Sequence, residues 1–158
     1  MRISDQYVWN FLFSLFFMSL IISGMIILDS VAARPLGTVD PMTFFVLALA
    51  IFRLTRLIVH DKITAFFREQ FYDVVETKTK RYLEKPVSGP RRTMADLLSC
   101  PWCIGMWASA TILFFYHLTL SAWFPILFFA LAGLGTLFQL VANALGWKAE
   151  QLKREVEG

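Results

Sequence analysis

Long apolar runs alternate with short charged segments along this chain, and the lengths of the runs predict its main elements. Three runs contain no Lys, Arg, Asp or Glu, and a fourth contains only Arg53 and Arg56. Each run reaches the ~18 residues that mark a candidate membrane-spanning helix. The pattern therefore predicts four transmembrane helices, at residues 7–28, 41–60, 101–119 and 123–147.

The segments outside these helices show two further patterns. After the second helix, apolar residues recur every three or four positions among charged ones, which is typical of an amphipathic helix. Residues 61–77 are predicted to form a cytoplasmic interfacial helix with its Phe face toward the lipid, or to pack that face on another subunit. Residues 78–99 then form a basic cytoplasmic loop, and residues 148–158 a charged cytoplasmic tail. The expected fold class is a single all-α membrane domain over residues 1–158.

Composition and charge support a membrane protein and indicate its orientation. Hydrophobic residues make up 57% of the chain and charged residues 17%, against roughly 45–50% and about 25% in soluble domains. Lys and Arg gather between the second and third helices and in the tail, so the positive-inside rule places both termini in the cytoplasm. The net charge of +3 therefore reflects topology and contacts with anionic lipid rather than nucleic-acid binding. The first apolar run is longer than the ~7–15 residues of a signal-peptide core, so we expect an uncleaved helix.

The one constellation that suggests chemistry is Cys100-Pro101-Trp102-Cys103, at the start of the third predicted helix. Ser99 or Cys100 is a suitable N-cap, and Pro101 suits the first helical position. Both sulfur atoms would then lie in the first turn, where the helix dipole favours a thiolate. Thiols on the cytoplasmic side are normally kept reduced, so a permanent disulfide is not expected.

Three interpretations of this pair remain open. A dithiol redox switch needs two sulfur atoms close enough to bridge, and the spacing allows this. A zinc site needs about four ligands, so Cys100 and Cys103 would need His60 or a second subunit to complete it. Finally, the two small side chains can simply pack at a crowded helix start.

Polar residues inside two of the predicted spans are further candidates for function. Arg53, Arg56 and His60 share one face of the second helix, and an arginine inside a span costs roughly 2.5–3.5 kcal/mol at its centre. Arg56 is expected to reach the headgroups, whereas Arg53 either does the same or pairs with an inward carboxylate or carbonyl group. Gln139 and Asn143 lie four residues apart in the last span and predict either hydrogen bonds between helices or a hydrated pathway.

Two motifs together resemble a known family. The first is Phe-Arg-Leu-Thr-Arg-Leu-Ile at residues 52–58 with Asp-Lys-Ile at 61–63, and the second is Asp-Leu-Leu-Ser-Cys-Pro-Trp-Cys at residues 96–103. Over roughly residues 43–146, the chain resembles the small bacterial membrane proteins grouped as the "domain of unknown function 1360" family, some of which are labelled as sporulation-related. The resemblance implies a bacterial membrane protein and carries no established activity. The characteristic positions that it implies are Arg53, Arg56, Asp61, Cys100, Cys103 and Trp107.

Antiparallel packing of the second and third helices would bring the two motifs to a similar depth. We therefore predict a shallow cytoplasmic pocket that holds an anion, a lipid headgroup or a metal, or that locks the two helices together. Its residues are Arg53, Arg56, Asp61, Asp96, Cys100, Cys103 and Trp107.

The function classes that the sequence favours are not enzymatic. It contains no Walker-type glycine loop, no Gly-x-Ser-x-Gly and no His-Glu-x-x-His motif. The leading hypothesis is a scaffold or partner-binding component in the bacterial cytoplasmic membrane, assembled with copies of itself or with another membrane protein and needing no cofactor. The alternatives are a thiol redox or metal sensor that uses the cysteine pair, and a small holin-like pore that depends on Gln139 and Asn143.

Overall fold

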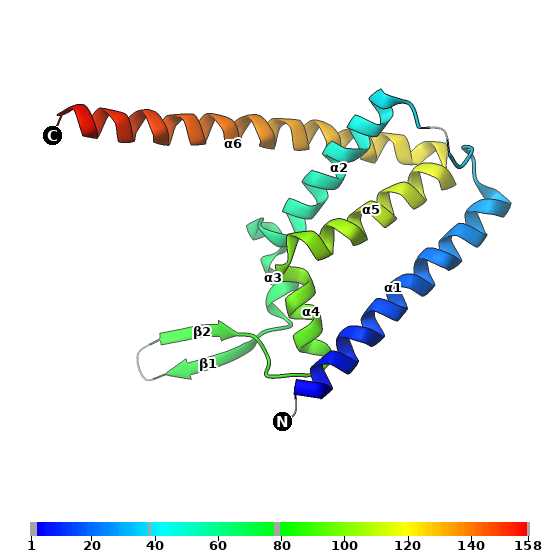
Figure 1. Cartoon of the computed structure of the whole chain (residues 1–158), viewed down its shortest axis with the longest axis horizontal. Helices are drawn as coiled ribbons and strands as arrows, with labels where there is room; N and C mark the ends of the chain where they lie inside the picture. Colours follow the sequence, from blue (N-terminus) through cyan, green and yellow to red (C-terminus); the bar gives the residue numbers. More distant parts are fainter. Residues whose placement is uncertain (1–2, 38, 78–79, 158) are drawn as a thin grey trace.

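The computed structural model describes residues 3–37, 39–77 and 80–157, and helices make up most of it (Figure 1). In chain order, the elements are α1 (Ile3–Val31), α2 (Pro41–Val59), the 3-10 helix η1 (Lys62–Thr64), α3 (Ala65–Glu69), β1 (Asp73–Thr77), β2 (Lys80–Glu84), α4 (Pro90–Ser99), α5 (Pro101–Leu118), the 3-10 helix η2 (Leu120–Ala122) and α6 (Trp123–Glu157).

Among the described residues, three helical segments are long and apolar enough to cross a membrane: Asp5–Val31, Pro41–Val59 and Leu120–Val156. Helices α4 and α5 together form a fourth candidate, but the chain turns by 86° between them. The ranges predicted to be long helices from their apolar length are helices in the structure. Helix α6 continues past the predicted span into the charged tail, one of the two forms expected there, the other being a frayed end, and it reaches 35 residues, or roughly 52 Å.

The prediction of a continuous interfacial helix over residues 61–77 is wrong. Helical structure there ends at Glu69, after η1 and α3, and Asp73–Thr77 forms β1. Strand β1 pairs antiparallel with β2, and Val74 lies opposite Leu83 in this pairing. β-branched and other apolar side chains stabilise such cross-strand pairs, and here they continue the apolar spacing that suggested a longer helix.

The segment predicted as a basic loop, residues 78–99, is also partly regular. It contains β2 and the ten-residue helix α4. Pro90 occupies the first turn of α4, where its missing N–H has no intrahelical partner to lose. Gly89 before it has a φ of +93°, in the left-handed region that glycine adopts readily. The Pro and Gly that indicated a loop therefore form the start of a helix.

Helix α2 is the centre of the fold, because both α5 and α6 pack along it. Where α2 and α6 cross, Gly133 lies directly against the backbone of Leu49, so that any side chain at this position would collide with it. Small residues of this kind let membrane helices approach closely. The buried cluster at this interface consists of Leu47, Ala50, Ile112, Tyr116, Ala122, Ile126 and Ala130.

Helix α1 lies beside α4 and α5 (Figure 1) and is held by hydrogen bonds near both of its ends. Near its start, Gln6 Nε2 donates to Thr93 Oγ1 at 2.7 Å, and Thr93 Oγ1 donates to Asn10 Oδ1 at 3.0 Å. Just after its end, the Ala33 N–H donates to the His117 carbonyl at 2.9 Å. These two attachments fix α1 against α4 at one end and against α5 at the other.

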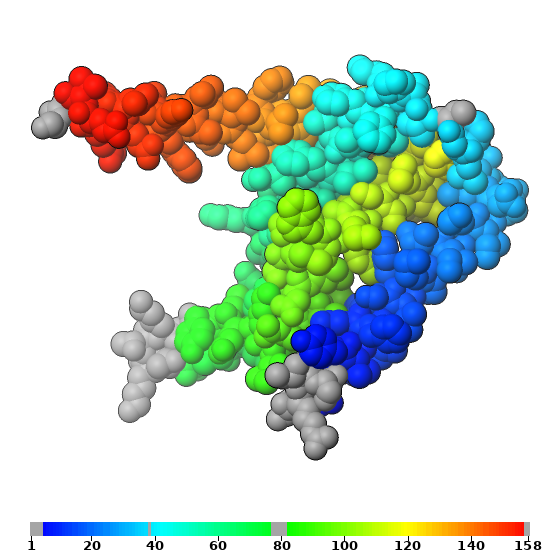
Figure 2. Space-filling model, in the orientation of Figure 1, coloured from blue at the N-terminus to red at the C-terminus, as the bar shows by residue number. Residues whose placement is uncertain are grey.

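The second half of α6 leaves the rest of the protein. Every residue from Leu137 to Val156 is exposed, and the space-filling view shows this part of α6 as a separate rod (Figure 2). Its apolar residues, which continue to Trp147, therefore lie outside the packing that the chain makes with itself.

Candidate functional site

The candidate site lies at the junction between α4 and α5, where Cys100 ends one helix and begins the next. Cys100 has an extended backbone, with φ −103° and ψ 108°, and its Sγ accepts a hydrogen bond from the Cys103 N–H at 3.3 Å. Pro101 follows in the first turn of α5. Of the two N-caps that the sequence allows, the structure therefore uses Cys100, and the predicted position of Pro101 is confirmed.

The two sulfur atoms of this junction are close neighbours. Cys103 Sγ lies 2.7 Å from Cys100 Sγ and donates a hydrogen bond to it. Hydrogen bonds from the thiol and the backbone N–H of Cys103 lower the pKa of Cys100, and the positive charge of Lys85 acts in the same direction. Cys100 is partly exposed and Cys103 is exposed. The site therefore presents an accessible thiol that is inclined to ionise, with a second thiol in contact with it.

Lys85 is held beside the thiols by Asp96. Lys85 Nζ lies 2.8 Å from both Asp96 Oδ1 and Ser99 Oγ, and Arg92 Nε donates to Asp96 Oδ2 at 2.8 Å. Partial burial alone would raise the pKa of Asp96, but the hydrogen bonds from Lys85 and Arg92 outweigh it and lower the pKa. Asp96 is therefore an ionised anchor that orients a cation toward Cys100.

A cleft of about 730 Å³ between α1 and the α4–α5 junction opens onto these groups. Trp107 forms part of its wall and packs on Phe17, with ring centroids 4.7 Å apart. The side chains that line it are Asn10, Phe13, Ser14, Phe17, Met18, Lys85, Thr93, Asp96, Leu97, Ser99, Cys100, Cys103, Met106 and Trp107.

The structure divides the predicted pocket into two groups. Its members Asp96, Cys100, Cys103 and Trp107 line this cleft, whereas Arg53, Arg56 and Asp61 are not among the residues that line it. The division follows from helix geometry. The position of Arg53 faces Gly133 of α6, whereas Thr55 faces Gly105 of α5, as expected for residues separated by about 200° of rotation.

The second group contains an ion pair and an unusual arginine. Arg53 Nη2 lies 2.8 Å from Asp61 Oδ2, and both side chains are partly buried. Arg53 thus has the inward carboxylate partner that was one of its two expected roles. Arg56 Nε is buried and has no hydrogen-bond partner among the described residues.

A metal site within one chain would need further ligands. Among the described residues, no group of three or more His, Cys, Asp or Glu is placed to hold a metal ion. Cys100 and Cys103 therefore supply two thiol ligands, and His60 does not join them to form such a group.

Gln139 and Asn143, the polar residues of the last predicted span, bond to each other. Gln139 Nε2 donates to Asn143 Oδ1 at 3.0 Å on the exposed part of α6. Neither of these residues lines the cleft beside Cys100 and Cys103.

Two parts of the site lie outside the sequence-predicted set. Pro86 and Gly89 indicate that the neighbouring Lys85 lies in a loop. The positive charge of Lys85 alone does not show that its side chain reaches Asp96. Asn10 and Ser14 lie four residues apart on α1, and this spacing does indicate a shared helix face. The sequence does not indicate that this face meets Thr93 and the thiols.

Comparison with known proteins places the chain in a family. Residues 46–142 match a family model described as a protein of unknown function, DUF1360. The chain belongs to the DUF1360 family. It is similar to the sporulation protein YjcA of Bacillus subtilis (strain 168), with 34% identity over 111 residues that cover 66% of this chain and 94% of that protein. It is also similar to the UPF0713 protein YngL of the same organism, with 40% identity over 76 residues that cover 45% of this chain and 55% of that protein. No solved structure matches.

The DUF1360 match confirms the predicted resemblance and has a clear structural boundary. It runs from α2 into α6 and so includes both motifs, with Arg53, Asp61, Cys100, Cys103 and Trp107. It leaves out α1. The wall that α1 contributes to the thiol cleft therefore lies outside the matched range.

Proposed function

We propose that this DUF1360 protein is a non-enzymatic membrane scaffold that assembles with a second copy of itself through the exposed part of α6. The observation that carries the proposal is the isolation of this segment. Residues from Leu137 to Val156 are all exposed, although the helix remains apolar as far as Trp147. The apolar part of this helix extends past the part that packs on the rest of the chain, and an apolar helix surface left uncovered in this way is suited to contact another helix in the bilayer.

The face of α6 that a second copy would contact is defined by small and polar residues. Gly135, Gln139, Asn143 and Gly146 fall within about 80° of one another around the helix at ~100° per residue. A Cβ atom added at either glycine would meet no atom within 4 Å, so both positions are open to a close approach. Amide side chains inside a membrane hydrogen-bond across helices, and the same face of a second copy supplies matching groups in a symmetric dimer.

This face points away from the rest of the chain. Ile126, Ala130 and Gly133 bring α6 onto α2, and the centre of this group lies about 150° around the helix from the centre of the polar face at ~100° per residue. A second copy can therefore bind along α6 without displacing α2.

Paired single-cysteine crosslinking tests the scaffold. In a background with both native cysteines changed to Ser, Asn143→Cys should form dimers with a short bis-maleimide in native membranes. Val141→Cys, about 160° away around the same helix at ~100° per residue, is the matched control and should remain monomeric. Equal crosslinking at both positions, or crosslinking at neither, would show that α6 does not form this interface.

We further propose that the chain spans the bacterial cytoplasmic membrane with both termini inside. The basic residues that support this orientation lie in the segment from α3 to α4 and after Trp147. In the same thiol-free background, Glu155→Cys should react with a membrane-impermeant maleimide only in inside-out vesicles. Ser121→Cys, in the turn between α5 and α6, should react only in intact cells or right-side-out vesicles. The reverse labelling pattern would contradict this orientation.

A thiol-based sensor is the second candidate function, and the 2.7 Å separation of Cys100 Sγ and Cys103 Sγ favours it. A hydroperoxide would be the oxidant. The Cys100 thiolate attacks the outer peroxide oxygen, the O–O bond breaks, and Cys100 becomes a sulfenic acid while the alcohol or water departs. Cys103 then attacks the Cys100 sulfur, its thiol proton leaves with the sulfenic hydroxyl as water, and the disulfide forms. Two electrons in total pass from the thiols to the peroxide.

Maleimide gel-shift trapping in acid-quenched cells tests the sensor. Brief exposure to hydrogen peroxide should protect both thiols from maleimide, and dithiothreitol should restore the labelling of both. Cys103→Ser should instead accumulate a Cys100 sulfenic acid that a dimedone probe captures. Thiols that stay reduced at peroxide levels that oxidise known cellular sensors would rule out this function.

A further inference from the structure

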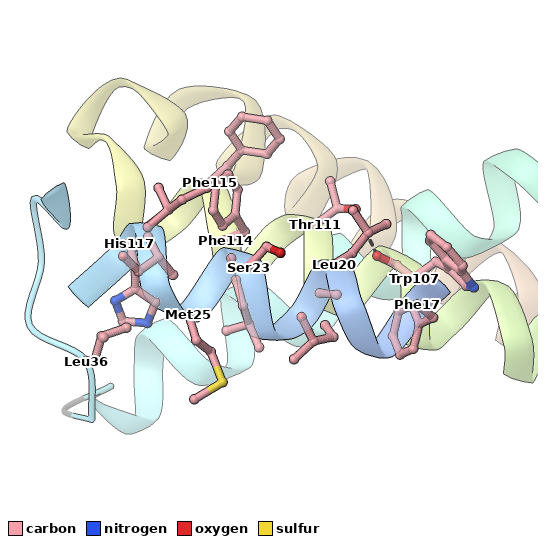
Figure 3. A pocket seen from close by; sticks show the side chains of 16 residues that line it. Phe17, Leu20, Ser23, Met25, Leu36, Trp107, Thr111, Phe114, Phe115 and His117 are labelled. Atoms are coloured by element: carbon pink, nitrogen blue, oxygen red, sulfur yellow. Dashed lines mark hydrogen bonds between the residues drawn. The ribbon is translucent and has the colours of Figure 1, made fainter. Parts of the chain in front are cut away.

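A second cleft, of about 580 Å³, runs between α1 and α5 and is lined almost entirely by apolar side chains (Figure 3). Phe17 and Trp107 stand at one end of it, and Leu36 and His117 stand at the other (Figure 3). Its volume lies within the ~300–1,000 Å³ of typical small-molecule sites. Because two helices alone form most of its wall, it has the shape of a slot along α5.

His117 is the feature that indicates a ligand. Its side chain lines the slot and is only 7% exposed, and its Nδ1 atom is buried with no hydrogen-bond partner among the described residues. The ring is held in place by edge-on contact with Tyr116, at 5.0 Å between ring centroids. Buried polar atoms in proteins are nearly always paired, so the unpaired Nδ1 of a side chain that lines the slot indicates that a polar partner is missing.

The surroundings of His117 specify the charge of that group. The backbone N–H of Arg34 donates to the His117 carbonyl at 3.3 Å. The Arg34 guanidinium donates to the Thr119 carbonyl at 3.0 Å and lies over the Tyr116 ring. A fixed positive charge therefore lies close to this end of the slot, on a residue that does not itself line it. No described acidic side chain lines the slot. An acidic group is favoured there over a basic one.

The length of the slot matches one lipid chain. Trp107 and His117 are ten residues apart on α5, which corresponds to about 15 Å along the helix. This is half of the ~30 Å hydrocarbon core of a bilayer. His117 is one residue from the end of α5, where a lipid head would meet water, and the apolar wall extends from it toward the middle of the helix.

We propose that the slot between α1 and α5 binds one long-chain fatty acid, with its carboxyl group hydrogen-bonded to His117 Nδ1 and its chain directed toward Trp107. A protonated acid donates its O–H to Nδ1, and a carboxylate accepts from the Nδ1–H tautomer, so either form satisfies the buried nitrogen. One wall of the slot is α1, which lies outside the DUF1360 match, and the other is α5, which lies inside it. The slot is also separate from the dimer face of α6.

Photocrosslinking with diazirine-labelled palmitic acid tests the proposal in nanodiscs of phosphatidylcholine. Mass spectrometry should place the adducts on α1 and α5 at residues that line the slot. Unlabelled palmitate should compete them away, whereas added phosphatidylcholine should not. Adducts spread evenly over the exposed apolar faces of α2 and α6, or competed equally by phospholipid, would show that the slot holds ordinary bilayer lipid and would overturn the proposal.

Two variants and one control complete the test. His117→Ala should weaken palmitate competition about tenfold, as expected for the loss of one strong hydrogen bond. Ala110→Phe fills the slot without touching His117 and should abolish labelling of α1. Leu131→Phe adds the same aromatic group on an exposed site of α6 and should change nothing. Each variant must retain the wild-type helical circular dichroism. Unchanged labelling in a folded Ala110→Phe protein would overturn the proposal, even if His117→Ala fails to fold.

Discussion

Arg53 Nη2 and Asp61 Oδ2 lie 2.8 Å apart, and this ion pair joins the inner face of α2 to the segment that follows it. The two side chains are 21% and 26% exposed, so the pair is neither fully buried nor free in solvent. Arg68 donates to the carbonyl of the same aspartate at 3.0 Å and to the Ile58 carbonyl at 2.6 Å. The end of α2 is thus closed by two arginines that converge on Asp61.

Asp61→Asn should destabilise the protein by roughly 1–2 kcal/mol, between the ~0–1 kcal/mol of exposed pairs and the ~3–5 kcal/mol lost when a buried pair is broken. The reason is that Arg53 would keep its charge without an ionised partner. Equilibrium unfolding in mixed detergent micelles, followed by circular dichroism, measures the change in unfolding free energy. Asp73→Asn is the matched control, because its pair with Arg91 is about half exposed and should contribute little. Equal effects from the two substitutions would contradict the structural role of Asp61.

Gly133→Ala should destabilise the protein by about 1–3 kcal/mol, the range for overpacked cores. The added methyl group would collide with the Leu49 backbone, and α2 and α6 would have to separate. Gly135→Ala provides the comparison two residues away, since its Cβ would meet no atom within 4 Å and alanine favours the helix. The free energy of unfolding should therefore be lower for Gly133→Ala than for the wild type, and equal or higher for Gly135→Ala. A reversed order would show that α6 does not cross α2 at Gly133.

Residues 101–119 illustrate what the sequence is able to predict. The absence of charge over a bilayer-length run marks a helix, and Pro101 after a capping residue marks where it begins. Residues 61–77 show the opposite case. Spacing of four among Ile63, Phe67 and Phe71 is compatible with a helix, but it does not reveal that the helix ends before Val74, which pairs with Leu83 of a neighbouring strand. Such pairing depends on residues distant in sequence, which a local pattern does not contain.

The candidate site shows the same limit for side chains. Arg53 and the cysteines are at comparable positions on adjacent helices, and depth alone suggested one pocket. The position of Arg53 around the axis of α2 decides which neighbouring helix it faces, and this residue faces Gly133 of α6. The cysteines instead line a cleft that α1 also lines, and the polar residues Asn10 and Ser14 of α1 gave no indication of this neighbour. Helix position was therefore predictable, whereas the identity of the neighbouring helix was not.

Thr93→Val should loosen the start of α1. The Thr93 side chain is 7% exposed and links Gln6 to Asn10 at the α1–α4 contact. Replacing its hydroxyl with a methyl group removes one hydrogen-bond partner from each of the two amides, and this should lower the stability of the α1–α4 contact by about 1 kcal/mol or more. Hydrogen exchange should rise in the first turns of α1 and remain unchanged in α2. Thr136→Val is the control, because the Thr136 hydroxyl bonds only its own helix at the Ala132 carbonyl. Protection of α1 that survives Thr93→Val would mean that other contacts hold this end.

The pH dependence of Cys100 alkylation should report the charge that Lys85 places beside it. The hydrogen bonds from Cys103 and the charge of Lys85 lower the pKa of Cys100, and the thiolate is the reacting form. The rate of Cys100 modification by iodoacetamide should therefore rise at a pH below the ~8.5 midpoint of an ordinary thiol. Lys85→Met removes the cation and also leaves Asp96 with one fewer counter-charge, and both changes raise the pKa of Cys100. The midpoint of the rate profile, measured on the Cys100 peptide by mass spectrometry, should shift to higher pH.

Lys148→Met, on the exposed part of α6, is the control and should leave the midpoint of the rate profile unchanged. If both substitutions shift it equally, net charge rather than the ion pair beside the helix start sets the reactivity of the thiol.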